Sequence, residues 1–195
     1  MAKGKNDLIL RDRLQFTIGS GGDLDVVYGR IDLSDYVSVV NNEGLAIKEV
    51  RFQVRDPQQT QTGSFSGVLN VNAVNEQYAS MKFFASTTAY ESAVDVGLAS
   101  PNVFALMEHQ YNFKLIQEGA NNVGGTNIIN RFEYGTPDLH PEGYTVVSDV
   151  LIGVSAVNAD AYEDATLEVD IMLIAEPIKV TKDELKDMLA QATDL

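Results

Sequence analysis

The sequence contains no cysteine and no tryptophan, and its only histidines are His109 and His140. Without cysteine the chain can form neither disulfides nor thiolate nucleophiles nor cysteine-based metal sites. Two histidines are too few for a multi-histidine metal centre. A conventional catalytic triad would have only these two residues to supply its histidine. The absence of tryptophan also weakens the case for a sugar-stacking surface. The composition therefore excludes more chemistry than it suggests.

Basic residues are scarce, because 14 lysines and arginines stand against 28 acidic residues and leave a formal net charge of −14. Such a surface repels phosphate backbones, which argues against a protein that reads DNA or RNA sequence. Long apolar runs are missing too. The stretch 171–175 is among the longest, and it is far shorter than the roughly 20 residues of a membrane-spanning helix. The two lysines near the start have no apolar segment behind them, so no secretory signal is expected.

Apolar and polar residues alternate along most of the 195 residues, a pattern typical of β-strands with one buried face. Turns rich in Gly, Asn, Asp and Pro separate the alternating segments. We expect the segment 121–126 to be a turn, and 32–40 fits either a helical turn or a further strand. The strands predicted from this pattern are 13–18, 24–31, 47–55, 65–74, 81–84, 111–117, 127–134, 144–157 and 165–174.

One sustained helix is predicted, over residues 182–192. Thr181 and Glu184 have the spacing of a capping box, and Leu185, Met188 and Leu189 recur on one helical face. The fold class is therefore all-β: an antiparallel β-sandwich of jelly-roll type with a short C-terminal helix. We divide the chain into a basic N-terminal arm (1–13), a sandwich domain (14–176) and a C-terminal helical tail (177–195).

Three acidic residues, Asp160, Glu163 and Asp164, fall within five positions and are candidate metal ligands. Carboxylate oxygens suit Ca²⁺, although neither this group nor the pair Asp23 and Asp25 has EF-hand spacing. Two interpretations stay open: a calcium site, or a solvated acidic loop of the kind expected in so acidic a protein. Calcium is the only cofactor that the sequence suggests.

Catalytic candidates are weak. The run Gly19–Gly22 lacks the third glycine of a dinucleotide-binding loop and the lysine of a phosphate-binding P-loop, so it predicts a turn. His140 and His109 each lie beside a carboxylate, but no second catalytic residue stands at a spacing that would support a general base. We identify no catalytic residue and expect a protein that is not an enzyme.

Two stretches, 29–37 and 141–149, look like those in coat-protein-like sequences of marine viruses, and the final strand 167–174 runs into a terminal tail. With the short basic arm and the polar loops, the chain resembles the single jelly-roll coat proteins of small icosahedral viruses. The resemblance implies a self-assembling capsid protein whose partners are copies of itself in a closed shell. It also implies a virion location with assembly in the host cytoplasm, and no membrane.

In a shell, Lys3, Lys5, Arg11 and Arg13 are the residues we expect to face a packaged genome. The chain departs here from the long arginine-rich arms of many coat proteins, so only a weak, non-specific contact is expected. Three alternatives stay open: a phage-type tail or baseplate subunit, a carbohydrate- or protein-binding adhesion module, and a hydrolase on a sandwich fold. Fold alone does not decide among them.

Overall fold

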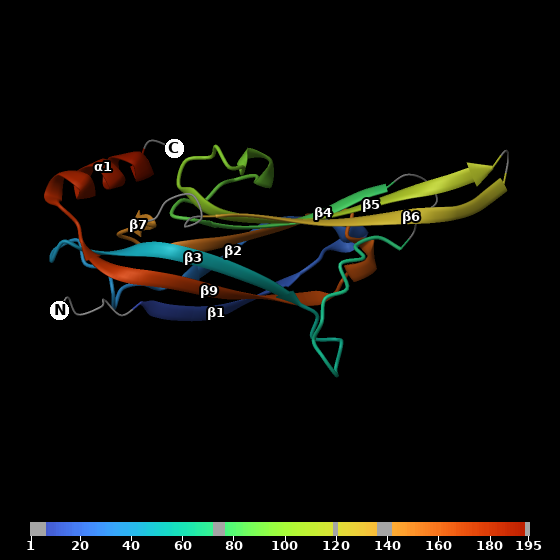
Figure 1. Cartoon of the computed structure of the whole chain (residues 1–195), viewed down its shortest axis with the longest axis horizontal. Coiled ribbons are helices and arrows are strands. Elements are labelled where there is room, and N and C mark those ends of the chain that lie inside the picture. The colour runs from blue at the N-terminus through green and yellow to red at the C-terminus, as the bar shows by residue number, and fades with distance from the viewer. Residues whose placement is uncertain (1–6, 72–76, 119–120, 136–141, 194–195) are drawn as a thin grey trace.

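The computed structural model describes residues 7–71, 77–118, 121–135 and 142–193. In this part of the chain nine strands form two antiparallel sheets, with strand orders β1-β9-β3-β7 and β2-β8-β4-β5-β6 (Figure 1). The strands are β1 (Leu8–Thr17), β2 (Leu24–Ile31), β3 (Glu43–Arg55), β4 (Gln77–Ser86), β5 (Val103–Glu118), β6 (Asn121–Gly135), β7 (Tyr144–Val146), β8 (Val150–Val157) and β9 (Thr166–Lys179). The all-β, jelly-roll-type sandwich is confirmed.

The core lies between the two sheets, because every second side chain of each strand points inward. On β9 the inward residues are Leu167, Val169, Ile171 and Leu173, all of them buried. Phe83 is fully buried at the centre of β4, and its ring meets that of Phe16 on β1 edge to face, with centroids 5.9 Å apart. The same alternation turns polar side chains of both sheets outward.

The predicted strand 144–157 is wrong as a single element, because it divides into β7 and β8. β7 pairs with β3 in one sheet, whereas β8 lies between β2 and β4 in the other. The chain changes sheets at residues 147–149, where the Asp149 carboxylate accepts a hydrogen bond from the Leu33 amide at 2.9 Å. Most of both halves is apolar and half-buried or buried, so alternation alone does not reveal the break.

Two other predicted elements, the strand 65–74 and the turn 121–126, are also wrong. Residues 65–71 of the predicted strand 65–74 form no strand, although Leu69 is fully buried and its carbonyl accepts a hydrogen bond from Ala161. Residues 72–74 lie outside the described residues. The predicted turn 121–126 lies within β6 and pairs with β5, and the ambiguous segment 32–40 forms turns and one isolated bridge.

The boundaries of the predicted arm and tail also move. β1 begins at Leu8, so residues 8–13 belong to the sheet and pair with β9; residues 1–6 lie outside the described part. Leu8 and Leu10 pack against the core. Their burial holds this stretch in the sheet although basic residues flank it in the sequence. β9 likewise continues to Lys179, past the predicted boundary at residue 176.

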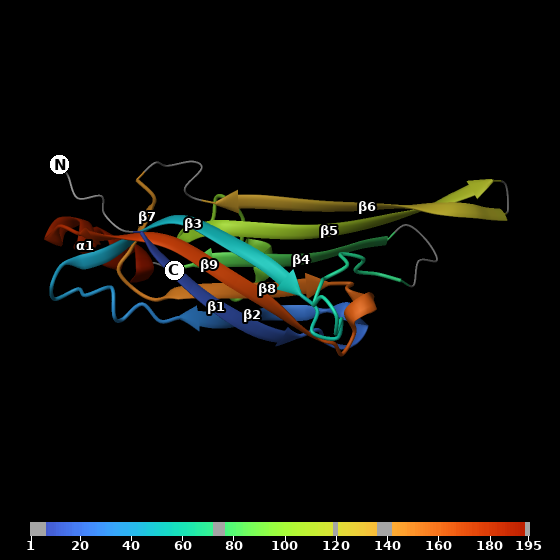
Figure 2. The same cartoon turned by 60° about the horizontal axis from the view of Figure 1, so that its bottom comes forward.

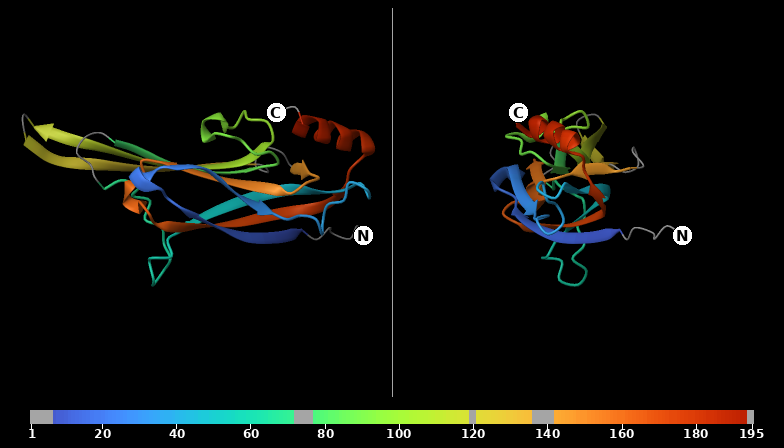
Figure 3. Two further views of the ribbon diagram at one scale, coloured as in Figure 1. Left: turned by 180° about the vertical axis from the view of Figure 1, so that it is seen from behind. Right: turned by 90° about the vertical axis from the view of Figure 1, so that its left-hand side faces the viewer.

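The C-terminal helix α1 (Lys182–Thr193) is confirmed with its capping box. The Glu184 amide donates to the Thr181 hydroxyl at 3.3 Å, and the Glu184 carboxylate accepts from the Thr181 amide at 2.8 Å. The bonds that the Thr181 amide and hydroxyl donate to the carboxylate lower the pKa of Glu184. The helix lies at one end of the sandwich (Figure 3). Within the described residues, the chain has no helix with the length and apolar character needed to cross a membrane.

A hairpin of β5 and β6 projects from the opposite end of the sandwich (Figure 2). β4 ends its pairing with β5 at Gln77, which stands opposite Phe113. β5 continues to Glu118, and its last five residues pair only with β6. The hairpin therefore extends past the other strands of its sheet.

Replacing Phe83 by alanine should lower the free energy of unfolding by roughly 3–5 kcal/mol, because the change leaves a cavity between the sheets. Phe132→Ala is the matched control, since that ring is 38% exposed and its loss should change the stability of the isolated chain little. Denaturant unfolding at low protein concentration measures both. Equal losses for the two variants would contradict the placement of the core.

Candidate functional site

Arginines gather on the outward face of the four-stranded sheet. Of the six arginines in the chain, four extend from β1 and β3 on this face, and Arg131 reaches the same region from β6. Arg131 donates a hydrogen bond to the Phe52 carbonyl of β3 at 3.0 Å. We call this group the arginine face; its members are Arg11, Arg13, Arg51, Arg55 and Arg131. A shallow groove of about 800 Å³ is lined by all of these except Arg55.

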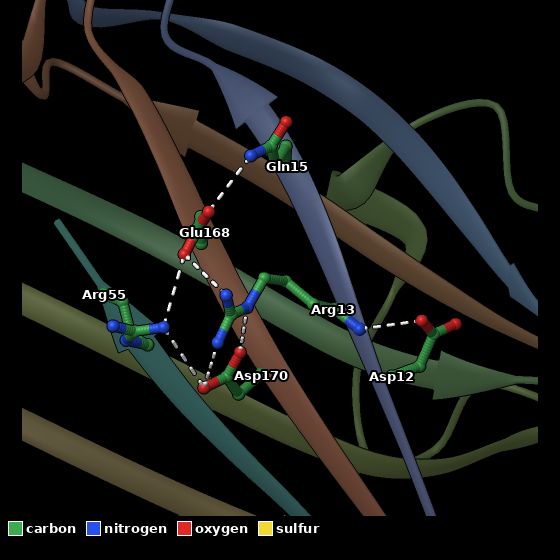
Figure 4. A network of polar contacts seen from close by, with 6 residues as sticks. All are labelled: Asp12, Arg13, Gln15, Arg55, Glu168 and Asp170. Atoms are coloured by element: carbon green, nitrogen blue, oxygen red, sulfur yellow. Dashed lines mark hydrogen bonds and ion pairs between the residues drawn. The ribbon is translucent and has the colours of Figure 1, made fainter. Parts of the chain in front are cut away.

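Two carboxylates of β9 neutralise the centre of the arginine face (Figure 4). Arg13 binds Asp170 at 2.5 Å and lies 3.5 Å from Glu168, and Arg55 lies 3.5 Å from Glu168. Gln15 also donates to Glu168, at 3.0 Å. Glu168 is only 8% exposed, so these partners compensate for the removal of its carboxylate from water. The network joins β1, β9 and β3 through their side chains.

Most of the positive charge on this face is therefore already paired. Arg51 forms an ion pair with Glu49, and Arg131 forms one with Glu133. Of the residues expected to face a genome, Arg13 is paired, and its hydrogen bond to Asp170 raises its pKa. Arg11 stands beside it on β1, whereas Lys3 and Lys5 lie outside the described residues. A face so neutralised offers few free cations to a phosphate backbone.

The acidic loop makes separate hydrogen bonds. Asp160 accepts from the Asn70 side chain at 3.1 Å, and Glu163 accepts from the Gly21 amide at 2.9 Å. Asp164 follows with a left-handed backbone, φ 57°. Among the described residues there is no group of three or more His, Asp or Glu side chains that could hold a metal ion. Calcium binding by this loop stays a prediction.

The turn at Gly19–Gly22 joins β1 to β2 in the other sheet and packs against the acidic loop. A Cβ atom on Gly22 would lie 2.4 Å from the Asp160 amide nitrogen, so the close approach requires glycine. Asp23 accepts a hydrogen bond from the Asn158 amide at 2.9 Å. The glycines therefore serve the packing of the two turns.

His109 lies on β5 and packs against the segment that follows β3. Its Nε2 is 3.3 Å from the Gly67 carbonyl, and its ring meets that of Phe65 edge to face at 5.2 Å. Burial is the main cause that lowers the pKa of His109, and the charge of Arg131 lowers it further. These contacts hold residues 65–67 against the sheet. His140 lies outside the described residues.

A groove of about 440 Å³ lies on the outward face of the five-stranded sheet. Lys82 crosses it and donates to the carbonyls of Ala93 at 2.9 Å and Val96 at 2.8 Å. Glu108 lies 3.6 Å from the same ammonium group. The lysine thereby fastens the loop 93–96 over β4.

The part of β6 that lies beside the sheet exposes apolar side chains, which the sequence did not distinguish from core residues. Ile128, Phe132 and Tyr134 share one face of β6, with exposures of 51%, 38% and 39%, and the Phe132 and Tyr134 rings stack 6.4 Å apart. Tyr78 of β4 lies on the same face and is 47% exposed. The only sequence signal was their alternation, which equally predicts a buried face.

No family model matches the chain, and no curated protein matches it. Among solved structures, it is similar to the BFDV capsid protein in a crystal structure of the 60-mer. The identity is 12% and the TM-score 0.28, over 91% of this chain and 96% of that one.

Replacing Glu168 by glutamine should lower the free energy of unfolding by about 1–3 kcal/mol, because Arg13 and Arg55 lose a shared, buried carboxylate. Glu49→Gln is the matched control. It removes the partner of the more exposed Arg51 and should change stability by about 0.5 kcal/mol or less. Chemical denaturation measures the free energy of unfolding of both variants. A Glu168→Gln variant as stable as wild type would show that the network does not hold the sheet.

His109 should make the folded state less stable as the pH falls. Its pKa in the fold is lowered from the ordinary 6.5, so the unfolded chain takes up a proton first. The stabilisation is complete above about pH 6.5 and is lost as the pH drops through the interval down to the lowered pKa. His109→Gln should flatten this part of the stability profile between about pH 7.5 and 5.5. A wild-type profile that matches the variant's would contradict the burial of His109.

Proposed function

We propose that this chain is a self-assembling structural protein, the coat subunit of a closed shell. The observation that carries the proposal is the edge strand β6, together with the end of the β5–β6 hairpin that projects past the sheet. The projecting end is a two-stranded ribbon, which is at best marginally stable in water by itself. Next to it, the exposed apolar side chains of β6 beside the sheet favour contact with another protein surface. In a shell, neighbouring copies supply that surface.

The fold and the charge support the same proposal. Jelly rolls occur in capsid proteins and in lectins, which is an analogy at the level of fold. The net charge of −14 would keep completed particles apart in solution. In a virion, the arginine face is the surface best suited to a genome, and its paired charges limit it to a weak, salt-sensitive contact.

A structural role also agrees with how the described polar groups are used. Glu168 is engaged with two arginines, Lys82 with two backbone carbonyls, and His109 with the Gly67 carbonyl. Each of these contacts fastens one segment of the fold to another. We therefore assign these residues to stability rather than to catalysis.

Electron microscopy of the purified full chain, with light scattering for mass, tests the proposal. We expect closed particles of uniform size above a threshold concentration. Salt should lower that threshold, because it screens the repulsion between acidic copies. Stacked rings or tubes would indicate a tail subunit instead, and a monomer at every concentration and salt would overturn the proposal.

Ile128→Asp should abolish or strongly weaken assembly while the chain still folds, because the charge lies on the exposed face of the hairpin. Val94→Asp adds the same charge at a side chain that is 90% exposed and lies outside the hairpin, so it is the matched control. Light scattering measures assembly and circular dichroism measures folding. Unimpaired assembly by Ile128→Asp would remove the hairpin from the contact.

A further inference from the structure

We propose that β6 pairs with β6 of a second copy as antiparallel edge strands, around a two-fold axis that passes through Phe132. This inference rests on the proposed self-assembly and names one of its contacts. β6 is fifteen residues long and lies at the edge of its sheet, with β5 on one side and no strand on the other in the described part of the chain. Its outer backbone groups can therefore bond to a further strand.

The other edge strands are less suited to pairing. β7 has only three residues. β2 is interrupted by a register shift between Leu24 and Val27, and such a bulge disrupts a straight edge. β1 carries three consecutive charged residues, 11–13, in the middle of its length. Charges and bulges of this kind protect edges from other chains. β6 has no charged run, and beyond a register shift near its start it pairs regularly from Gly124 to Gly135, whereas β2 pairs regularly over only Val27–Ile31.

Charge identifies the second copy as the occupant. Arg131 and Glu133 are separated by one residue, so they lie on the same face of β6 and form an ion pair there. When two copies of β6 run antiparallel about Phe132, Arg131 of each stands opposite Glu133 of the other. Opposite charges in directly facing positions stabilise a strand pair, and like charges weaken it.

Neighbouring registers lack this complementarity. An axis through Arg131 would place two arginines opposite each other, and an axis through Glu133 would do the same with two glutamates. An axis through Asn130 would leave both charges facing neutral residues. The register about Phe132 also brings together the two exposed Phe132 rings and sets each Tyr134 opposite an Asn130. It spans Ile129 to Gly135 in both copies.

The strand is also neutral, since its two charged residues among 121–135 cancel. Two chains of net charge −14 repel each other over most of their surfaces, so a neutral, partly apolar edge is where they can approach. Arg131 additionally donates to the Phe52 carbonyl, which fixes its position before a partner arrives. The structure thus assigns β6 as a self-complementary surface.

Charge reversal and mixing test this directly. Arg131→Glu alone and Glu133→Arg alone each place like charges opposite each other twice, and each should weaken self-association by about 10-fold or more. An equimolar mixture of the two variants should restore association, because in the mixed pair two glutamates of one chain face two arginines of the other. Sedimentation velocity measures association, and native mass spectrometry identifies the mixed dimer.

The matched control is the pair Glu49 and Arg51 on β3, which has the same spacing and the same kind of ion pair. Glu49→Arg and Arg51→Glu change the net charge equally, and their mixture should gain no special affinity. Should Arg131→Glu fold poorly without its bond to Phe52, Glu133→Arg still tests the contact when mixed with wild type, which it should bind less well than wild type binds itself.

Three results separate this inference from the proposed function. If the mixture of variants does not associate, or if both variants associate as wild type does, the β6 contact is wrong even where shells form. If β6 dimers form but no closed particle ever does, the shell proposal fails and the contact stands. If wild type stays monomeric at all concentrations, both fail.

Discussion

The sandwich depends on one constraint: each sheet must cover the apolar face of the other. Leu167, Val169, Ile171 and Leu173 of β9 and Met81 and Phe83 of β4 satisfy it, and they are buried nearly completely. The four-stranded sheet, however, is narrower than its five-stranded partner. β6 lies at the edge of the wider sheet, where Arg131 reaches β3, and the end of β5 pairs only with β6. The sheet surface that is not buried between the two sheets is available for contact with other molecules.

Electrostatics follows from the same arrangement. The outward face of the four-stranded sheet carries most of the arginines, and Glu168 and Asp170 of the central strand β9 pair with those that flank them. A strand in the middle of a sheet is the position from which one carboxylate can reach arginines on both neighbours. The cations thus stabilise the sheet, and the remaining surface keeps the acidic character of the chain.

Much of the fold could be predicted from the sequence, since β2, most of β9 and the capped helix α1 follow from local alternation and from Thr181 and Glu184. The division into β7 and β8 could not be predicted, because the change of sheet at residues 147–149 depends on Asp149 binding the distant Leu33 amide. Leu69 is buried although it belongs to no strand, so the apolar pattern around it resembles that of a strand. The ion pairs of β9 join residues more than 100 positions apart, and their partners become apparent only in three dimensions.

Hydrogen–deuterium exchange, compared between dilute and assembled protein, tests the central claim most directly. The edge amides of β6 are open to water in the single chain, and pairing with a second copy would close them. We expect slower exchange across Ile129 to Gly135 on assembly, with β2, the other edge of the same sheet, as internal reference. Unchanged exchange in β6 while other segments become protected would show that the copies meet elsewhere.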